Sequence, residues 1–308
     1  MYLEQDAHFD EAEDVLLTLI RVGGARLAAS DATAGWMRVG RVRRIQADFD
    51  RADAAYAEAG RIAAAGGDHQ SLLLSRVGQC NVLYFRGNLP EAERGWRGLL
   101  ADAAGYESVE AHAEHGLGTV LQRRGQPHEG APHLWRAYEL HEDEDGQLRA
   151  LNDLGSLLLT LGDVTGAERA LAEVIRRERM PDNLANATIE LMHCASFRRD
   201  RVGFERWRER ALDRLEEALP NIRADYHLKV GIGLARFGNY TKAEAQMQQA
   251  LEIASAHELH EFVFRLERIK GGLRECEALT YVESAATEPA QWTERLREVS
   301  ASLAALSA

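Results

Sequence analysis

The sequence predicts an all-α fold, a right-handed α-solenoid of about six to seven helix pairs with a C-terminal capping helix. Three observations lead to this prediction. A turn motif recurs, reading Gly-Asn-Leu-Pro-Glu-Ala at Gly87–Ala92, Gly-Asp-Val-Thr-Gly-Ala at Gly162–Ala167 and Gly-Asn-Tyr-Thr-Lys-Ala at Gly238–Ala243. Apolar residues on both sides of each turn follow the spacing of a helix face. The stretches between the motifs contain no long linker.

The repeat around Gly162 illustrates the predicted helix pair. Apolar residues at spacings of three and four form one stripe before the turn and a second stripe after it. These stripes are Leu151, Leu154 and Leu158, then Ala167, Leu171 and Val174. Thr165 followed by Glu168 predicts a capping box at the start of the second helix, and Asp50 followed by Asp53 predicts a similar cap one hundred or so residues earlier.

Weaker copies of the turn extend the repeat along the chain. They lie at Ala7, Ala47, Gly125 and Arg199, so that turn positions recur every 37 to 40 residues. The copy after Arg199 is the weakest, because Gly203 or Phe204 falls where a small residue is expected and Trp207 fills the next core position. We expect a local distortion of the array at this copy.

The formal net charge of −12 narrows the classes of partner. Non-specific binding of DNA or RNA needs a basic surface, and so does binding to an anionic membrane. We therefore expect no direct nucleic-acid partner and no membrane partner.

The widely separated Cys80, Cys194 and Cys276 predict reduced thiols. The N-terminus lacks the pattern of a signal peptide, so a cytoplasmic location is expected, and the Arg-, Ala- and Gly-rich composition is typical of a GC-rich bacterial genome.

Motifs of catalysis are missing from the sequence. It contains no Gly-x-Ser-x-Gly, no Walker-type phosphate loop and no His-Glu-x-x-His, so we expect neither an enzyme nor a cofactor. His112 and His115 are three residues apart, close enough to share a metal ion. A zinc site needs three or four ligands in fixed geometry, and the favoured interpretation is two solvent-facing histidines with no metal.

The copies share one pattern of small and large residues. The first full copy supplies Trp36, Val39-Gly40, Arg43, Ala47-Asp48, Ala52, Tyr56 and Ala59. The sixth supplies Val230-Gly231, Leu234, Gly238-Asn239-Tyr240, Ala243, Met247 and Ala250. This pattern resembles the tetratricopeptide repeat over roughly residues 7–255. The copies exceed the family's usual 34 residues, which implies helices longer by about a turn. In this respect the chain is similar to the sensor modules of bacterial MalT-like and Rap/PlcR-like regulators.

The resemblance implies a concave groove, lined by the first helix of each repeat, that binds a protein or peptide. The family's groove positions correspond here to Met37, Arg38, Arg41, Arg44, Asn81, Tyr84, Phe85, His112, His115, Thr119, Asn152, Asp153, Ser156, Asn186, Glu190, His193 and Lys229. Asn, His and Arg side chains of this set can hydrogen-bond a peptide backbone or a carboxylate. The alternative interpretation is a solvated polar face without a ligand.

Together these observations predict a repeat array over residues 1–273 and a helical cap over residues 274–308. The predicted function is a non-catalytic scaffold for protein–protein or peptide interaction. The alternative is a ligand- or peptide-sensing module of a bacterial transcriptional or signalling regulator. The terminal helix is expected to have Trp292, Leu296, Val299, Leu303 and Leu306 on one face. This apolar stripe also allows a homodimer, although a simple cap explains it equally well.

Overall fold

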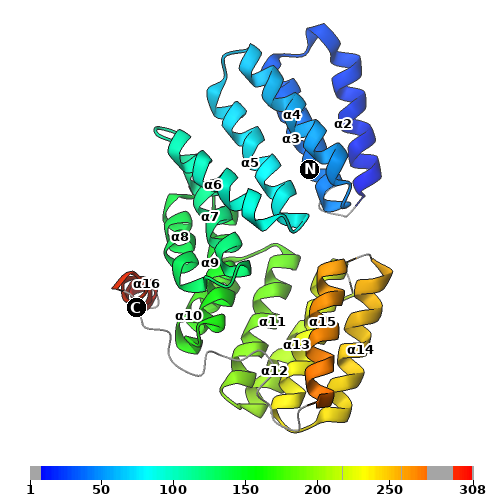
Figure 1. The fold of residues 1–308 in the computed structure, drawn as a ribbon, viewed down its shortest axis with the longest axis vertical. Coiled ribbons are helices and arrows are strands. Elements are labelled where there is room, and N and C mark those ends of the chain that lie inside the picture. Colours follow the sequence, from blue (N-terminus) through cyan, green and yellow to red (C-terminus); the bar gives the residue numbers. More distant parts are fainter. Residues whose placement is uncertain (1–7, 217, 258, 276–293, 307–308) are drawn as a thin grey trace. The chain divides into compact units, whose positions relative to one another are not determined.

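The structure is a computed structural model that describes residues 8–216, 218–257, 259–275 and 294–306, and these residues form helices and no strand. Figure 1 shows their arrangement. In chain order the elements are α2 (Phe9–Gly23), η1 (Gly24–Arg26), α3 (Ala29–Ile45), α4 (Phe49–Ala65), α5 (His69–Phe85), α6 (Leu89–Asp102), α7 (Glu107–Arg123), α8 (Pro127–Leu140), α9 (Glu144–Thr160), α10 (Val164–Arg177), α11 (Pro181–Phe197), α12 (Arg201–Leu212), α13 (Pro220–Arg236), α14 (Tyr240–Ala256), α15 (His260–Glu275) and α16 (Glu294–Leu306). The predicted all-α fold of consecutive helix pairs is confirmed.

The predicted turn positions share one backbone conformation. The φ angles are 61° at Ala47, 85° at Gly87, 79° at Gly125, 82° at Gly162, 56° at Arg199 and 78° at Gly238. This left-handed conformation is easy for glycine and strained for other residues. The two degenerate copies therefore keep the turn geometry although they lack the glycine. The remaining predicted turn, at Ala7, lies outside the described residues.

Aspartates that belong to the turns cap the second helices. Asp48 accepts a hydrogen bond from the Arg51 backbone N–H, and Asp163 accepts one from the Gly166 backbone N–H at 2.9 Å. The prediction that Thr165 and Asp50 are the caps is wrong, because each helix begins before them. The residue directly after the left-handed position already has the non-helical backbone of an N-cap, and its carboxylate reaches the free donors of the first turn.

Glycines of the first helix in a pair make room for large side chains from the second helix of the preceding pair. A Cβ atom added to Gly116 of α7 would lie 2.2 Å from the ring of Trp96 in α6, and one added to Gly233 of α13 would lie 2.3 Å from the ring of Phe204. In the fifth copy the buried ring is thus Phe204, at a position that is alanine or glycine in the other copies. Trp207 is left half-buried, and α12 has only 12 residues.

The two described cysteines are buried free thiols. Burial raises the pKa of Cys80 to about 11 and raises the pKa of Cys194 well above its usual range. Because the thiolate is the reactive form, both side chains serve as small apolar core residues. Cys276 lies outside the described residues.

The chain divides into two compact units. Unit 1 comprises residues 1–126 and 139–142, and unit 2 comprises residues 127–138 and 143–308. Among the largest buried side chains of unit 1 are Leu73, Trp96, Leu99 and Leu117. Unit 2 has one apolar cluster that includes residues of α9, α10 and α16, and another that runs from α11 to α15.

The C-terminal helix α16 packs against α10 (Figure 1). Leu296, Val299 and Leu303 are buried and belong to the same cluster as Leu171 and Val174. The apolar stripe predicted for this helix is therefore covered within unit 2. Trp292, the first residue of the predicted stripe, lies outside the described residues, and the boundary at residues 273/274 stays a prediction.

Candidate functional site

The candidate site is the face formed by the first helix of each pair. We call these the A helices (α3, α5 and α7 in unit 1; α9, α11 and α13 in unit 2) and their partners the B helices. Within each unit, consecutive A helices contact one another directly, whereas B helices contact A helices and hardly one another among the described residues. Closer spacing on one side of a helix array curves it toward that side. The A face is therefore the inner side of each unit.

Aromatic and arginine side chains stack together on the A face of unit 1. The Tyr84 and Phe85 rings meet edge to face with centroids 5.2 Å apart. The guanidinium of Arg44 lies 4.6 Å from the Phe85 centroid, and that of Arg123 lies 4.5 Å from the Tyr84 centroid. Arg123 also donates to the Tyr84 carbonyl oxygen at 3.0 Å. These contacts join α3, α5 and α7, and Phe85 remains 50% exposed. We call Arg44, Tyr84, Phe85 and Arg123 the aromatic cluster.

The other predicted residues of α3 and α5 surround this cluster. Met37 packs against a small core that contains Tyr56 and Val82. Arg38 and Asn81 are half-buried, whereas Arg41 is exposed. Burial raises the pKa of Tyr56, although the positive charges of Arg44 and Arg41 oppose the shift. Tyr56 therefore stays neutral, and the positive charge on this part of the face is carried by arginines.

Histidines gather on α7 and at the end of α8. The rings of His112 and His115 both meet the His141 ring edge to face, with centroids 5.1 and 5.9 Å apart. His112 Nδ1 is 2.7 Å from the Ser108 carbonyl oxygen. Thr119 donates to the Gly116 carbonyl oxygen of its own helix at 3.0 Å. Among the described residues, no group of three or more His, Cys, Asp and Glu side chains is placed to hold a metal ion.

A buried ion cluster occupies the A face of unit 2. Lys229 Nζ donates to Glu190 Oε1 at 2.7 Å and to Asp225 Oδ2 at 2.6 Å. Burial alone would lower the pKa of Lys229, but attraction to Asp225 and Glu190 outweighs burial and raises it. Glu190 and Lys229, both predicted to bind a partner, thus form an ion pair with each other, and little of either side chain is exposed.

A second aromatic and arginine contact lies beside this ion cluster. The Arg236 guanidinium is 3.7 Å from the centroid of the Phe197 ring, and it donates to Ser196 Oγ at 2.7 Å. His193 is 2% exposed and meets the Phe197 ring edge to face at 5.0 Å. Of these residues, His193 was among the predicted binding residues, and it lies beneath the surface.

The predicted residues of α9 and the first half of α11 are half-buried. They are Asn152, Asp153, Ser156 and Asn186. Asn152 Oδ1 is buried and has no hydrogen-bond partner among the described residues. A buried carbonyl oxygen in this state is costly, and a donor from a bound partner would satisfy it.

Sequence comparison with the family missed Arg123 and Phe197. A signal for both exists within the sequence. An aromatic residue at the end of one A helix is followed 39 residues later by an arginine at the end of the next, as in Tyr84 with Arg123 and Phe197 with Arg236. Because 39 residues is about one repeat, each arginine falls beside the preceding aromatic ring.

No helix among the described residues is both long and apolar enough to cross a membrane.

Comparisons with known proteins agree with the repeat. Residues 147–179 match the family model described as Tetratricopeptide repeat. No curated protein matches the chain. Among solved structures, a tetratricopeptide repeat protein from Parabacteroides merdae ATCC 43184 is 14% identical over 86% of this chain and 96% of its own, with a TM-score of 0.48.

Two further solved structures are similar to the chain. YrrB, described as a tetratricopeptide repeat protein with an unusual peptide-binding site, is 18% identical over 63% of this chain and 90% of its own, with a TM-score of 0.35. BtubC from P. vanneervenii is 16% identical over 83% of this chain and 91% of its own, with a TM-score of 0.37. The matched segment 147–179 spans α9, the turn at Gly162 and α10, the same helix pair that recurs along the described chain. Residues 147–179 therefore carry a tetratricopeptide repeat.

Proposed function

We propose that the chain is a non-catalytic scaffold that binds a protein or peptide partner on the A face of its helix pairs. The observation that carries this proposal is the aromatic cluster of unit 1. Two aromatic side chains and two arginines stack across three consecutive A helices, and the Phe85 ring is half exposed. Tyr and Arg are enriched among the residues that contribute most to binding at interfaces.

The charge of this surface favours an acidic partner. Arg38, Arg41, Arg44 and Arg123 lie on the A face of unit 1 in a chain whose formal net charge is −12. Guanidinium groups bind carboxylates through paired, charge-assisted hydrogen bonds. We therefore expect a peptide that combines Asp or Glu with an aromatic or aliphatic anchor that packs on Phe85.

A displayed library of random peptides tests this proposal with the full chain as bait. Wild type should enrich acidic peptides that contain an aromatic or aliphatic residue. Arg41→Gln and Phe85→Ala should each weaken the selected peptides by about 10-fold, because a binding hot spot contributes roughly 1.4 kcal/mol or more.

Two control variants match these substitutions on other surfaces. Arg61→Gln changes an exposed arginine of the B helix α4, and Phe264→Ala removes a 69% exposed phenylalanine of α15. Neither should alter peptide affinity. Peptides bound equally by wild type and by Phe85→Ala would contradict the proposed anchor. A library without any enriched sequence would contradict the peptide-binding function itself.

A ligand-sensing module is the second candidate function. The observation that favours it is a cavity of about 630 Å³ in unit 2, lined by α10, α11, α12 and the segments that follow α10 and α12. A sensor gains thermal stability when its ligand binds the native state. The similarity to MalT-like and Rap/PlcR-like regulators, the bacterial and cytoplasmic setting and a homodimer through the terminal helices stay predictions. The molar mass in solution tests the homodimer.

A further inference from the structure

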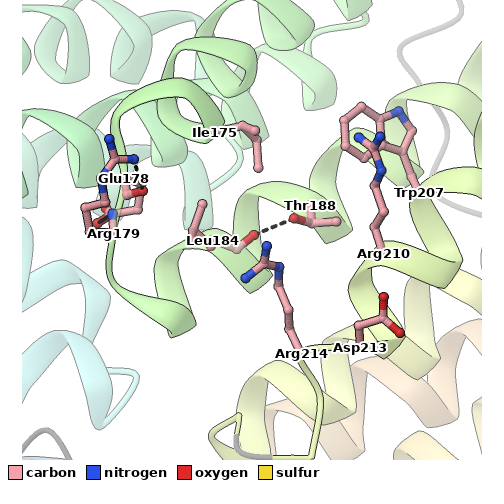
Figure 2. Close-up of a pocket in the computed structure, with 9 residues that line it drawn as sticks. All are labelled: Ile175, Glu178, Arg179, Leu184, Thr188, Trp207, Arg210, Asp213 and Arg214. Carbon is pink, nitrogen blue, oxygen red and sulfur yellow. Dashed lines mark hydrogen bonds between the residues drawn. The ribbon is translucent and has the colours of Figure 1, made fainter.

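A cavity opens in unit 2 between α10, α11 and α12. Its volume is about 630 Å³, within the range of about 300–1,000 Å³ that is usual for small-molecule sites. Figure 2 shows how the lining residues are placed: Ile175 lies in the last turn of α10, Leu184 and Thr188 lie on α11, and Trp207 and Arg210 lie on α12. The cavity is therefore built from three successive helices of one unit.

One face of α12 supplies the cationic side of the cavity. Trp207, Arg210 and Arg214 are spaced by three and four residues, which places them on one side of the helix and its C-terminal extension. Figure 2 shows Arg210 alongside Trp207, and its guanidinium lies 4.9 Å from the indole centroid. Arg179 lines the opposite side, from the segment between α10 and α11.

These arginines differ from those elsewhere in the chain that form ion pairs. Arg176, for example, pairs with Glu173 at 2.5 Å, and Arg198 pairs with Glu168 at 2.8 Å. Among the described residues, by contrast, Arg179, Arg210 and Arg214 form no salt bridge. The Arg179 guanidinium donates to the Glu178 carbonyl oxygen at 3.1 Å, on the opposite side of the cavity from Arg210. The like charges of the three arginines that line the cavity repel one another, and an anion would relieve this repulsion.

The two carboxylates of the lining do not neutralise the arginines. Glu178 is 4% exposed, and its Oε1 accepts the backbone N–H groups of Arg179 and Met180, both at 2.8 Å. Its Oε2 accepts from Asn183 Nδ2 at 2.9 Å. The hydrogen bonds of the Glu178 carboxylate are thus made to residues at and just before the start of α11. Asp213 is exposed and is the only other acidic residue among those that line the cavity.

The remaining lining is apolar and aromatic. Ile175 and Leu184 contribute aliphatic surface, and the indole of Trp207 offers a flat ring. The Thr188 hydroxyl donates to the Leu184 carbonyl oxygen at 2.6 Å, so its lone pairs remain as acceptors at the cavity wall. A ligand that matches this lining carries a negative head group on an aromatic or aliphatic body.

We propose that the cavity lined by α10, α11 and α12 binds a small organic anion, with a phosphate or carboxylate group held by Arg179, Arg210 and Arg214 and an apolar body packed on Trp207. The site is distinct from the A face and does not depend on the scaffold function. Phosphate and carboxylate share the chemistry that these arginines recognise, and the choice of probes separates the two.

Calorimetric titration of the full chain with four probes tests the proposal. The probes are phenyl phosphate, benzoate, inorganic phosphate and benzyl alcohol. An aromatic anion should bind at least about 10-fold more tightly than inorganic phosphate and than the neutral alcohol. A tenfold difference in Kd corresponds to about 1.4 kcal/mol, which one additional favourable contact supplies. Tighter binding of phenyl phosphate identifies a phosphate site, and tighter binding of benzoate identifies a carboxylate site. No saturable binding of either aromatic anion would overturn the proposal.

Charge substitutions at exposed positions test the site without threatening the fold. Arg214→Gln should weaken the bound anion by about 10-fold, through the loss of a charge-assisted contact. Asp213→Asn should strengthen it by roughly twofold, because a repulsive charge is removed. Arg201→Gln is the matched control, an exposed arginine at the start of α12 that does not line the cavity. Equal effects of Arg214→Gln and Arg201→Gln would overturn the proposal, because anion affinity would then depend on the net charge of the protein and not on a contact in the cavity.

Trp207→Leu separates the contribution of the ring from that of the charges. This variant should retain the weak binding of inorganic phosphate and lose the preference for the aromatic anion. An unchanged preference would contradict the assigned place of the apolar body. Because Trp207 also packs against the core, its variant is compared with Arg214→Gln, whose side chain is exposed.

Discussion

Lys229 on α13 and Glu190 on α11 form an ion pair inside unit 2, with Nζ and Oε1 2.7 Å apart and only 8% and 9% of the two side chains exposed. Asp225, one turn earlier on α13, holds the same ammonium at 2.6 Å. The cluster joins two consecutive A helices at a fixed register. Sequence comparison placed Glu190 and Lys229 in a binding groove, yet each already has its partner.

Lys229→Met should lower the free energy of unfolding by about 3–5 kcal/mol, because removal of one member leaves buried carboxylates without compensation. Urea unfolding followed by circular dichroism measures the loss. Adding Glu190→Gln to this variant should restore part of the stability, since one of the unpaired charges disappears. The control is Lys242→Met on the exposed face of α14, expected within about 0.5 kcal/mol of wild type. A loss below about 1 kcal/mol for Lys229→Met would mean that water reaches the pair.

Ala47→Gly and Arg199→Gly should each stabilise the protein. Both residues hold a positive φ, which costs an L-residue about 1–2 kcal/mol. Glycine removes this strain but destabilises the folded state by about 0.5–1 kcal/mol, because its backbone loses more entropy on folding. We expect a net gain of roughly 0.5–1 kcal/mol in thermal or urea unfolding. Gly162→Ala, at the equivalent turn, should change stability in the opposite direction. If all three substitutions shifted stability the same way, the turn conformation would not be the cause.

Acid should destabilise unit 2 partly through His227. Burial lowers the pKa of His227, although its hydrogen bond with Gln246 at 2.9 Å opposes the shift. The unfolded chain takes up a proton near pH 6.5, whereas the folded chain resists protonation to lower pH. The contribution is therefore present above about pH 6.5 and is lost as the pH falls below that value. Unfolding free energies measured from pH 7.5 to 5 should fall less steeply for His227→Gln than for wild type. Parallel curves would exclude His227 as a contributor.

Leu303→Asp should release α16 from α10. Leu303 is fully buried in the cluster that α16 shares with α9 and α10, and a buried unpaired carboxylate is costly. Limited proteolysis should then cleave the chain near its C-terminal end, while circular dichroism retains most of the helical signal. Ala304→Asp changes the exposed neighbour and should leave the digestion pattern unchanged. Equal protection of both variants would argue against docking of α16 in solution.

The repeat pattern predicted the fold because the same few constraints act in every copy. Each turn needs a left-handed residue, and the spacing of these residues located the turns at Ala47 and Arg199 even without glycine. The predicted caps lie two residues too late. Asp163 belongs to the turn and also caps the helix, whereas the prediction assigned it to the turn alone. A position that serves two local requirements is ambiguous in the sequence.

The candidate site was less predictable, because side-chain partners come from different repeats. Glu190 and Lys229 are 39 residues apart, and nothing in either helix alone indicates that they neutralise each other. His193 likewise contacts Phe197 of its own helix and Arg236 of α13, one repeat later. Positions taken from a family pattern identify the face of a helix but not the depth at which each side chain lies.

Helix α11 is shared by the two surfaces of unit 2. Leu184 and Thr188 form a wall of the cavity, and Glu190 ties the same helix to α13 on the A face. Both contacts are made by one helix of 17 residues, which gives a displacement at one surface a direct route to the other. Thermodynamic linkage then demands reciprocity: whatever factor an anion in the cavity applies to partner affinity, the partner applies to the anion. Measuring either affinity with and without the other ligand yields the same coupling free energy.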